Sequence, residues 1–191
     1  NSKVDKISLL NGSANGIYVD DKFNPYDIIL SNIDIHYVYK NLLGYNFKFL
    51  KKLSTKKSTS AIIFYWGIKK NFKNLDLHNI FFSSNYQKEF NQIKEGNNIQ
   101  NDPTIYVNIT SKFIHSDAPE GCENWFVMIN VSHDKGQDWN LLVKQARITI
   151  IKKINKFLNS DLENNIVYEK HMSPTHIQEK TGAFQGALYG T

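Results

Sequence analysis

The chain has 191 residues, of which 41% are apolar and 13% aromatic, so we expect one domain or slightly more around a substantial core. Its formal charge is +5, but Arg147 is the only arginine. Because arginine dominates the recognition of bases and phosphates, no nucleic-acid partner is expected.

The only cysteine is Cys122, which excludes a disulfide framework and a cysteine-based metal site. Such cysteine usage favours a reducing, cytoplasmic setting. No apolar run has the length that is needed to cross a bilayer.

The first segment is expected to form strands and then a helix. Residues 3–19 predict two strands joined at the Asn11-Gly12 turn, and the apolar residues 25–30 predict a short buried strand. Asp34 is suited to cap the helix that follows. Proteins of the α/β class often bind ligands where a strand ends in a polar turn before a helix, so this turn is a candidate site.

An amphipathic segment and an apolar segment follow, and each has two interpretations. Between residues 48 and 58, lysine pairs alternate with Phe49 and other apolar residues, as in a patch that touches a membrane or in a surface helix over the core. Residues 60–68 form the most apolar run and predict a central strand with Phe64 and Trp66 on one face. That aromatic stripe either lines an apolar cavity or packs into the core.

The second half is expected to alternate between strands and helices. Strands are predicted over residues 78–82, 104–109, 125–129 and 164–169, and helices over 86–94, over 138–158 and from 174 onward. Residues 110–124 form a polar loop that is longer than a hairpin needs, and ordered loops of that length tend to carry function.

Glycines recur at every fourth position of the tail, at Gly182, Gly186 and Gly190. Small residues at this spacing allow the backbone to approach a flat group such as a cofactor ring, or to pack tightly against another part of the chain. Both alternatives remain open from the sequence.

The residues form no recognisable catalytic or metal-binding pattern. The histidines are scattered, and the chain lacks the short motifs of hydrolases, metalloproteases and phosphate-binding loops. We therefore expect an α+β fold, with a mixed β-sheet, flanking helices and an apolar interior, and neither a catalytic side chain nor a metal site.

Five motifs, in order along the chain, resemble those of the bacterial phytoene-type carotenoid desaturases. They are Ser31-Asn-Ile-Asp34 with His36-Tyr-Val-Tyr39, the strand from Ser58 to Gly67, His78-Asn-Ile-Phe-Phe-Ser83, Asp102-Pro-Thr-Ile-Tyr-Val107 with Asp117-Ala-Pro-Glu-Gly121, and Thr181-Gly-Ala-Phe-Gln-Gly-Ala-Leu-Tyr-Gly190. The resemblance implies a protein in which FAD oxidises a long apolar polyene, of the phytoene or diapophytoene type, by accepting hydride. It also implies peripheral association with a membrane surface on the cytoplasmic side, because such a substrate resides in a bilayer.

By the same resemblance, the chain corresponds to the second half of such a protein. Residues 1–34 and 174–191 would belong to a Rossmann-like FAD-binding domain, and residues 35–173 would form the substrate-binding domain. The candidate cofactor contacts are Asn32, Asp34, Gly182 and Gly186, and the candidate substrate contacts are Phe64 and Trp66. Because the family's dinucleotide-binding fingerprint is absent from these residues, the isolated chain is expected to be inactive and to hold little FAD.

Two other functions are compatible with the sequence. The aromatic stripe and the lack of catalytic groups also fit a stand-alone module that binds a carotenoid or another apolar ligand without flavin. The third possibility is a related flavin-dependent oxidoreductase that acts on a different isoprenoid, which analysis of its products would distinguish.

Overall fold

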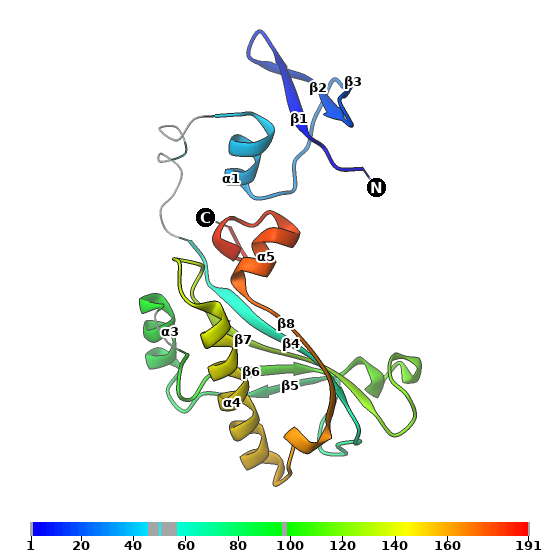
Figure 1. The fold of residues 1–191 in the computed structure, drawn as a ribbon, viewed down its shortest axis with the longest axis vertical. Helices are drawn as coiled ribbons and strands as arrows, with labels where there is room; N and C mark the ends of the chain where they lie inside the picture. Colours follow the sequence, from blue (N-terminus) through cyan, green and yellow to red (C-terminus); the bar gives the residue numbers. More distant parts are fainter. Residues whose placement is uncertain (1, 46–49, 51–56, 97–98, 191) are drawn as a thin grey trace.

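The computed structural model describes residues 2–45, 50, 57–96 and 99–190. Within these residues the strands form two sheets, a small N-terminal sheet and a larger one (Figure 1). The small sheet has the order β1 (Lys6–Leu10), β2 (Ser13–Val19), β3 (Lys22–Pro25). The larger sheet has the order β5 (His78–Phe81), β6 (Ile105–Asn108), β7 (Glu123–Val131), β4 (Ser60–Ile68), β8 (Ile166–Met172).

Helical segments flank these sheets. In chain order they are α1 (Ile35–Tyr37), η1 (Val38–Leu42), α3 (Tyr86–Glu95), η2 (Thr110–Lys112), η3 (His115–Asp117), α4 (Trp139–Leu158), η4 (Glu163–Asn165), α5 (Pro174–Thr181) and η5 (Phe184–Gly186). The α+β class is confirmed, but every described strand pairing is antiparallel, so the expectation of a mixed sheet was wrong. The direction of a strand depends on which strands become its neighbours, and β4, β7 and β8, which adjoin in the sheet, lie far apart in the sequence.

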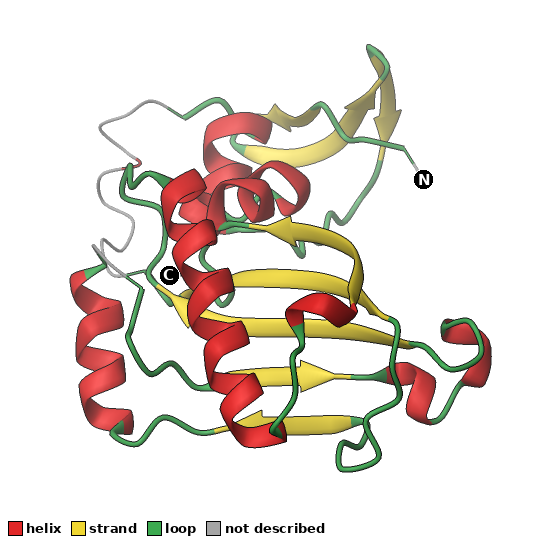
Figure 2. Ribbon diagram, turned by 60° about the horizontal axis from the view of Figure 1, so that its bottom comes forward, coloured by secondary structure: helices red, strands yellow, loops and turns green. Residues whose placement is uncertain are grey.

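The main core lies between the larger sheet and α4, which crosses one of its faces (Figure 2). Because side chains alternate along a strand, Phe64 and Trp66 of β4 point to this face, where they meet Trp125 of β7. All three side chains are at most 2% exposed. The helix contributes the buried residues Leu142, Val143, Ala146, Ile150, Ile151 and Ile154. Its first turn is capped by Asp138, whose carboxylate accepts a hydrogen bond from the Leu141 amide at 3.1 Å.

The opposite face of the larger sheet is only partly covered. At one end, Ala61 and Ile63 of β4 pack with Ile177 of α5, which in Figure 1 lies between the larger sheet and the N-terminal part of the chain. Farther along this face, Tyr65 of β4 is 37% exposed and Ile80 of β5 is 54% exposed. The two faces of the sheet are therefore not equivalent.

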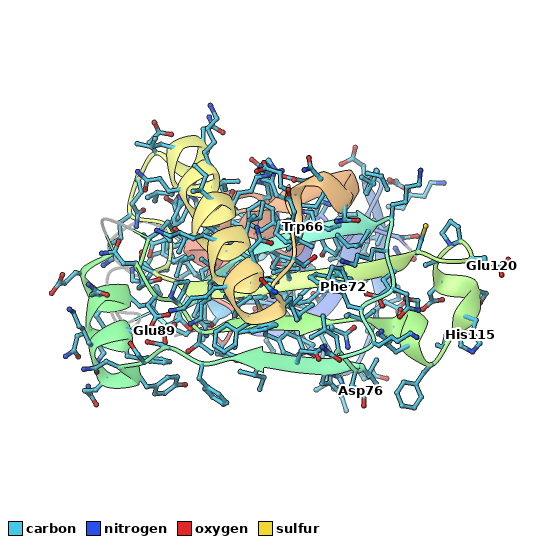
Figure 3. The ribbon with its side chains drawn as sticks, turned by 90° about the horizontal axis from the view of Figure 1, so that it is seen from below. Trp66, Phe72, Asp76, Glu89, His115 and Glu120 are labelled. Carbon is cyan, nitrogen blue, oxygen red and sulfur yellow. The ribbon has the colours of Figure 1, made fainter. Side chains whose placement is uncertain are left out.

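The long loop between β6 and β7 is attached to the sheet by a buried carboxylate. The Glu123 side chain is 1% exposed and lies 2.6 Å from the Nζ of Lys112. It also accepts a hydrogen bond from the backbone amide of Phe72 at 2.9 Å. In Figure 3 the loop, which carries the labelled Glu120, projects at one end of the sheet. A polar network therefore orders the stretch that the sequence indicated only as a long loop.

The buried strand predicted over residues 25–30 is not formed. Strand β3 ends at Pro25, and residues 26–34 contain neither helix nor strand. Ile28 is 79% exposed and Leu30 is 94% exposed. The prediction was wrong for this chain because an apolar run becomes a buried strand only when neighbouring strands pair with it, and the described residues supply none.

An ion pair connects α4 to the start of β6. The Nζ of Lys153 lies 2.6 Å from the Asp102 carboxylate and donates to the carbonyl oxygens of Phe82 and Pro103 at 2.8 Å. The hydrogen bond from Lys153, together with the one from the Ser84 amide, lowers the pKa of Asp102 from 3.8 to about 2. The charged carboxylate is therefore favoured by the folded state.

This shift predicts a specific loss of stability in acid. Since the pKa of Asp102 is lower in the folded protein, its contribution is complete above pH 3.8 and is lost as the pH falls toward about 2. We expect Asp102→Asn to lower the unfolding temperature at neutral pH and to flatten the dependence of that temperature on pH in this acid range. Glu120→Gln, which changes an exposed carboxylate, is the control and should keep the wild-type slope. An unchanged slope in Asp102→Asn would contradict the assignment.

Candidate functional site

Two segments from opposite ends of the chain meet in the structure, residues 31–37 and residues 182–186, and we call this region the terminal junction. The rings of His36 and Phe184 stack with their centroids 3.5 Å apart and an angle of 11° between their planes. A Cβ added to Gly182 would lie 2.9 Å from the Cδ1 of Ile33 and 3.1 Å from the Cδ2 of Tyr37. The structure thus brings together the two segments that were predicted to contact a cofactor.

The charges at the terminal junction are mostly positive. The carboxylate of Asp34 accepts a hydrogen bond from the His36 amide at 2.8 Å and so caps α1, as predicted. The pKa of His36 is lowered, first by burial and then by the nearby Lys57 and Lys40. The Nζ of Lys57 lies 5.0 Å from the centre of the Phe184 ring. The imidazole of His36, the ring of Phe184 and the ammonium of Lys57 are therefore adjacent.

Two pockets border the terminal junction. The first, of about 400 Å³, is lined mainly by apolar residues of β1, β2 and residues 29–33, and it includes Asn32. The second, of about 280 Å³, includes Lys40, Gln178 and Gly182. Two of the predicted cofactor contacts, Asn32 and Gly182, therefore border open space.

The other two predicted cofactor contacts are engaged within the chain itself. The Asp34 carboxylate is used in the helix cap. At Gly186, a Cβ would lie 2.3 Å from the carbonyl oxygen of Pro174, and the Gly186 carbonyl accepts a hydrogen bond from Ser60 Oγ at 2.6 Å. Of the two alternatives for the tail glycines, this geometry supports tight packing at Gly186.

A pair of glycine substitutions measures this packing. Gly186 and Gly121 both have positive φ, at +67° and +74°, but only Gly121 has open space around an added Cβ. We expect Gly121→Ala to lower stability by about 1–2 kcal/mol through backbone strain. Gly186→Ala should lose roughly a further 1–3 kcal/mol through overpacking. Thermal unfolding of both variants is the measurement, and equal losses would show that Pro174 yields to the new methyl group.

The predicted substrate contacts Phe64 and Trp66 lie in the main core. Phe64 is 0% exposed and Trp66 is 2% exposed, and their rings lie 5.3 Å apart beneath α4. Neither residue borders the two pockets at the terminal junction. The prediction that they line a substrate passage finds no support in this packing. The alternating side-chain directions along residues 60–68 predicted two faces of the strand, but they did not indicate which face α4 would cover.

The membrane patch predicted between residues 48 and 58 lies largely outside the described residues. Of its lysines, Lys57 is described, and it borders a pocket of about 510 Å³ together with Lys94 and Lys135. In the described part of the chain, no helix combines the length and apolar character that crossing a membrane requires. The same residues contain no cluster of three or more histidine, cysteine, aspartate or glutamate side chains suited to a metal ion.

Comparisons with known proteins agree with the motifs. No protein-family model matches the chain. It is 46% identical over 187 residues to a 1-hydroxycarotenoid 3,4-desaturase of Flavobacterium sp. (strain P99-3), a match that covers 98% of this chain and 38% of that protein. It is 33% identical to a phytoene desaturase of Fusarium fujikuroi, over 94% of this chain and 35% of that protein. A 4,4'-diaponeurosporene oxygenase of Staphylococcus aureus (strain bovine RF122 / ET3-1) is 29% identical, over 99% of this chain and 39% of that protein.

A solved structure shows the same fold. The crystal structure of an oxidoreductase from Methanosarcina mazei matches 89% of this chain and 36% of its own, with a TM-score of 0.57 and 14% identity. At that identity the match concerns the fold alone. The sequence matches confirm the resemblance seen in the motifs. Nearly the whole chain is similar to a segment of these carotenoid enzymes, and it spans between 35% and 39% of the length of the relatives named above.

Proposed function

We propose that the protein that contains this chain is an FAD-dependent desaturase that oxidises a long apolar polyene of the phytoene or diapophytoene type. The observation that carries the proposal is the 46% identity to a 1-hydroxycarotenoid 3,4-desaturase over 98% of this chain. The terminal junction supports it, because it unites the two segments that resemble the family's cofactor-binding passages.

The proposed division of labour follows the two ends of the chain. Residues 1–34 and 174–191 belong to the FAD-binding domain, and residues 35–173 form the substrate-binding domain. The exposure of Leu30, at 94%, supports this division. Leu30 belongs to the apolar residues 25–30, and an exposed apolar segment fits a strand whose pairing partners lie elsewhere in the protein. The contact between Gly182 and Ile33 supports a shared location for the two end segments.

The residues present fit a flavin in part. Asn32 and Gly182 border the pockets and would contact it, whereas Asp34 and Gly186 support the backbone around them. When bound, FAD supplies the hydride acceptor. The chain's own contribution is to hold the apolar substrate beside the cofactor and to exclude water, which requires no acid–base side chain. Peripheral membrane contact through residues 48–58, on the cytoplasmic side, is part of the same proposal.

The experiment uses the complete protein, purified with its flavin and supplied with phytoene in liposomes. We expect stoichiometric FAD and products whose absorption moves to longer wavelength as double bonds are added. Products with unchanged absorption and mass would contradict the proposal.

A second candidate is an oxygenase, favoured by the 29% identity to the 4,4'-diaponeurosporene oxygenase over 99% of this chain. The mass of the product distinguishes the two. Desaturation removes two hydrogen atoms for each new double bond, whereas oxygenation adds oxygen.

A further inference from the structure

Four aromatic side chains form a continuous line across the face of the larger sheet that α4 does not cover. They are His78 of β5, Tyr106 of β6, Phe126 of β7 and Tyr65 of β4, and we call them the aromatic row. Successive ring centroids lie 6.0 Å, 6.2 Å and 5.7 Å apart. Each ring comes from a different strand, so the row runs across the strands rather than along them.

The aromatic row belongs to the uncovered face by register and by exposure. Tyr65 pairs with Phe126 between β4 and β7, so the two side chains share a face, and their neighbours Phe64 and Trp66 point to the other one. Tyr65 is 37% exposed, against 0% for Phe64. Phe126 and Tyr106 are half-buried and His78 is exposed. The row is therefore a surface of the sheet and not part of the main core.

The hydroxyl groups of the two tyrosines in the aromatic row already have partners. The hydroxyl of Tyr106 lies 2.7 Å from the Nδ1 of His78. The hydroxyl of Tyr65 donates to the Sδ of Met172 on β8 at 3.5 Å. These contacts hold the two tyrosines in place, and what the row presents to a ligand is mainly ring surface. Such a surface is suited to an apolar, unsaturated chain.

The aromatic row adjoins a small apolar cluster that also contacts the terminal junction. Phe126 packs against the small cluster formed by Ala61, Ile63 and Ile177, and Ala183 packs against the same cluster. Ile177 belongs to α5, which ends beside Gly182. The row therefore runs from β4 to the β5 edge of the sheet and passes beside the cluster that contains Ile177 of α5.

We propose that the polyene chain of the substrate lies along the aromatic row, with Tyr65, Phe126 and Tyr106 in contact with it. This inference rests on the proposed function, which supplies the substrate class. The rings of Tyr106, Phe126 and Tyr65, edge-to-face at 6.2 Å and 5.7 Å, contact a conjugated chain at several points, so a long ligand gains more from the row than a short one. Because Phe126 and Ala183 pack against the same cluster, a ligand on the row lies near the segment that is proposed to contact the flavin. Tyr65 and its partners are thus substrate-contacting residues, in place of Phe64 and Trp66.

The test uses the complete protein with Tyr65→Ala and Tyr106→Ala. We expect each variant to raise the KM for phytoene, and the dissociation constant for lycopene measured by visible absorbance, about ten-fold. The flavin content should be unchanged. Tyr65→Phe keeps the ring and should restore the wild-type values. The matched control is Tyr86→Ala, which removes a tyrosine of α3 that is 55% exposed and outside the row, and it should behave as wild type.

The outcomes separate this inference from the proposed function. Alanine variants that bind lycopene within about two-fold of wild type would overturn the aromatic row as the substrate contact. That result would indicate that another segment of the complete protein covers this face of the sheet. A wild-type protein that binds lycopene in a Tyr65-dependent manner but oxidises no polyene would leave the row standing and refute the desaturase activity. A wild-type protein that binds no polyene would overturn both.

Discussion

Phe64→Ala is expected to lower the free energy of unfolding by about 3–5 kcal/mol, as the loss of a fully buried aromatic ring does. Phe64 is 0% exposed, and its ring lies 5.3 Å from that of Trp66. The substitution would leave a cavity, and the packed residues of α4 limit how far the surrounding side chains can move to fill it. Urea unfolding of the protein, followed by tryptophan fluorescence, is the measurement.

The next residue in the sequence provides the control for Phe64. Tyr65→Ala removes a side chain of similar size from the opposite face, where it is 37% exposed and contacts Phe126. It should lower stability less, by roughly 1–2 kcal/mol, because the aromatic pair adds to the loss of only part of its buried area. We expect Phe64→Ala to act on stability and Tyr65→Ala to act on substrate affinity. A Phe64→Ala protein of normal stability and weakened substrate binding would support Phe64 as a substrate contact.

Glu123→Ala should be similarly damaging, with an expected loss of about 3–5 kcal/mol, because it breaks a buried ion pair. The Glu123 side chain is 1% exposed, and that of its partner Lys112 is 14% exposed. One carboxylate oxygen accepts a hydrogen bond from the Phe72 amide at 2.9 Å, and the other accepts one from the Nε1 of Trp125 at 2.8 Å. Removing the carboxylate leaves three donors around an apolar site.

Two further variants sharpen this test. Glu123→Gln keeps one acceptor oxygen and should lose less stability than Glu123→Ala. Glu120→Ala changes an exposed glutamate of the same loop and should stay within about 0.5 kcal/mol of wild type. The comparison is made by urea unfolding. A Glu123→Ala protein as stable as the Glu120→Ala protein would mean that the network orders the loop without stabilising the fold.

Sequence patterns were sufficient to predict those helices and strands whose formation depends on residues close together in the chain. The apolar positions of residues 138–158 predicted the long helix, which the structure has at Trp139–Leu158, because its 3.6-residue period and its Asp138 cap are both local. The run at residues 60–68 likewise predicted β4, which spans Ser60–Ile68. The motifs also sufficed for the resemblance to carotenoid desaturases, which the sequence matches confirm.

Where the outcome depends on distant residues, only the tertiary structure decided it. The alternation of β4 defined two faces, but α4 begins some 70 residues later and determines that Phe64 is core and Tyr65 is surface. The aromatic row depends on the register of four strands, which no single segment encodes. Residues 25–30 are apolar enough for a strand, yet a strand needs paired neighbours, and none is present among the described residues. The sequence by itself thus determined the elements and the resemblance, whereas the packing of distant segments decided which side chains are free to meet a ligand.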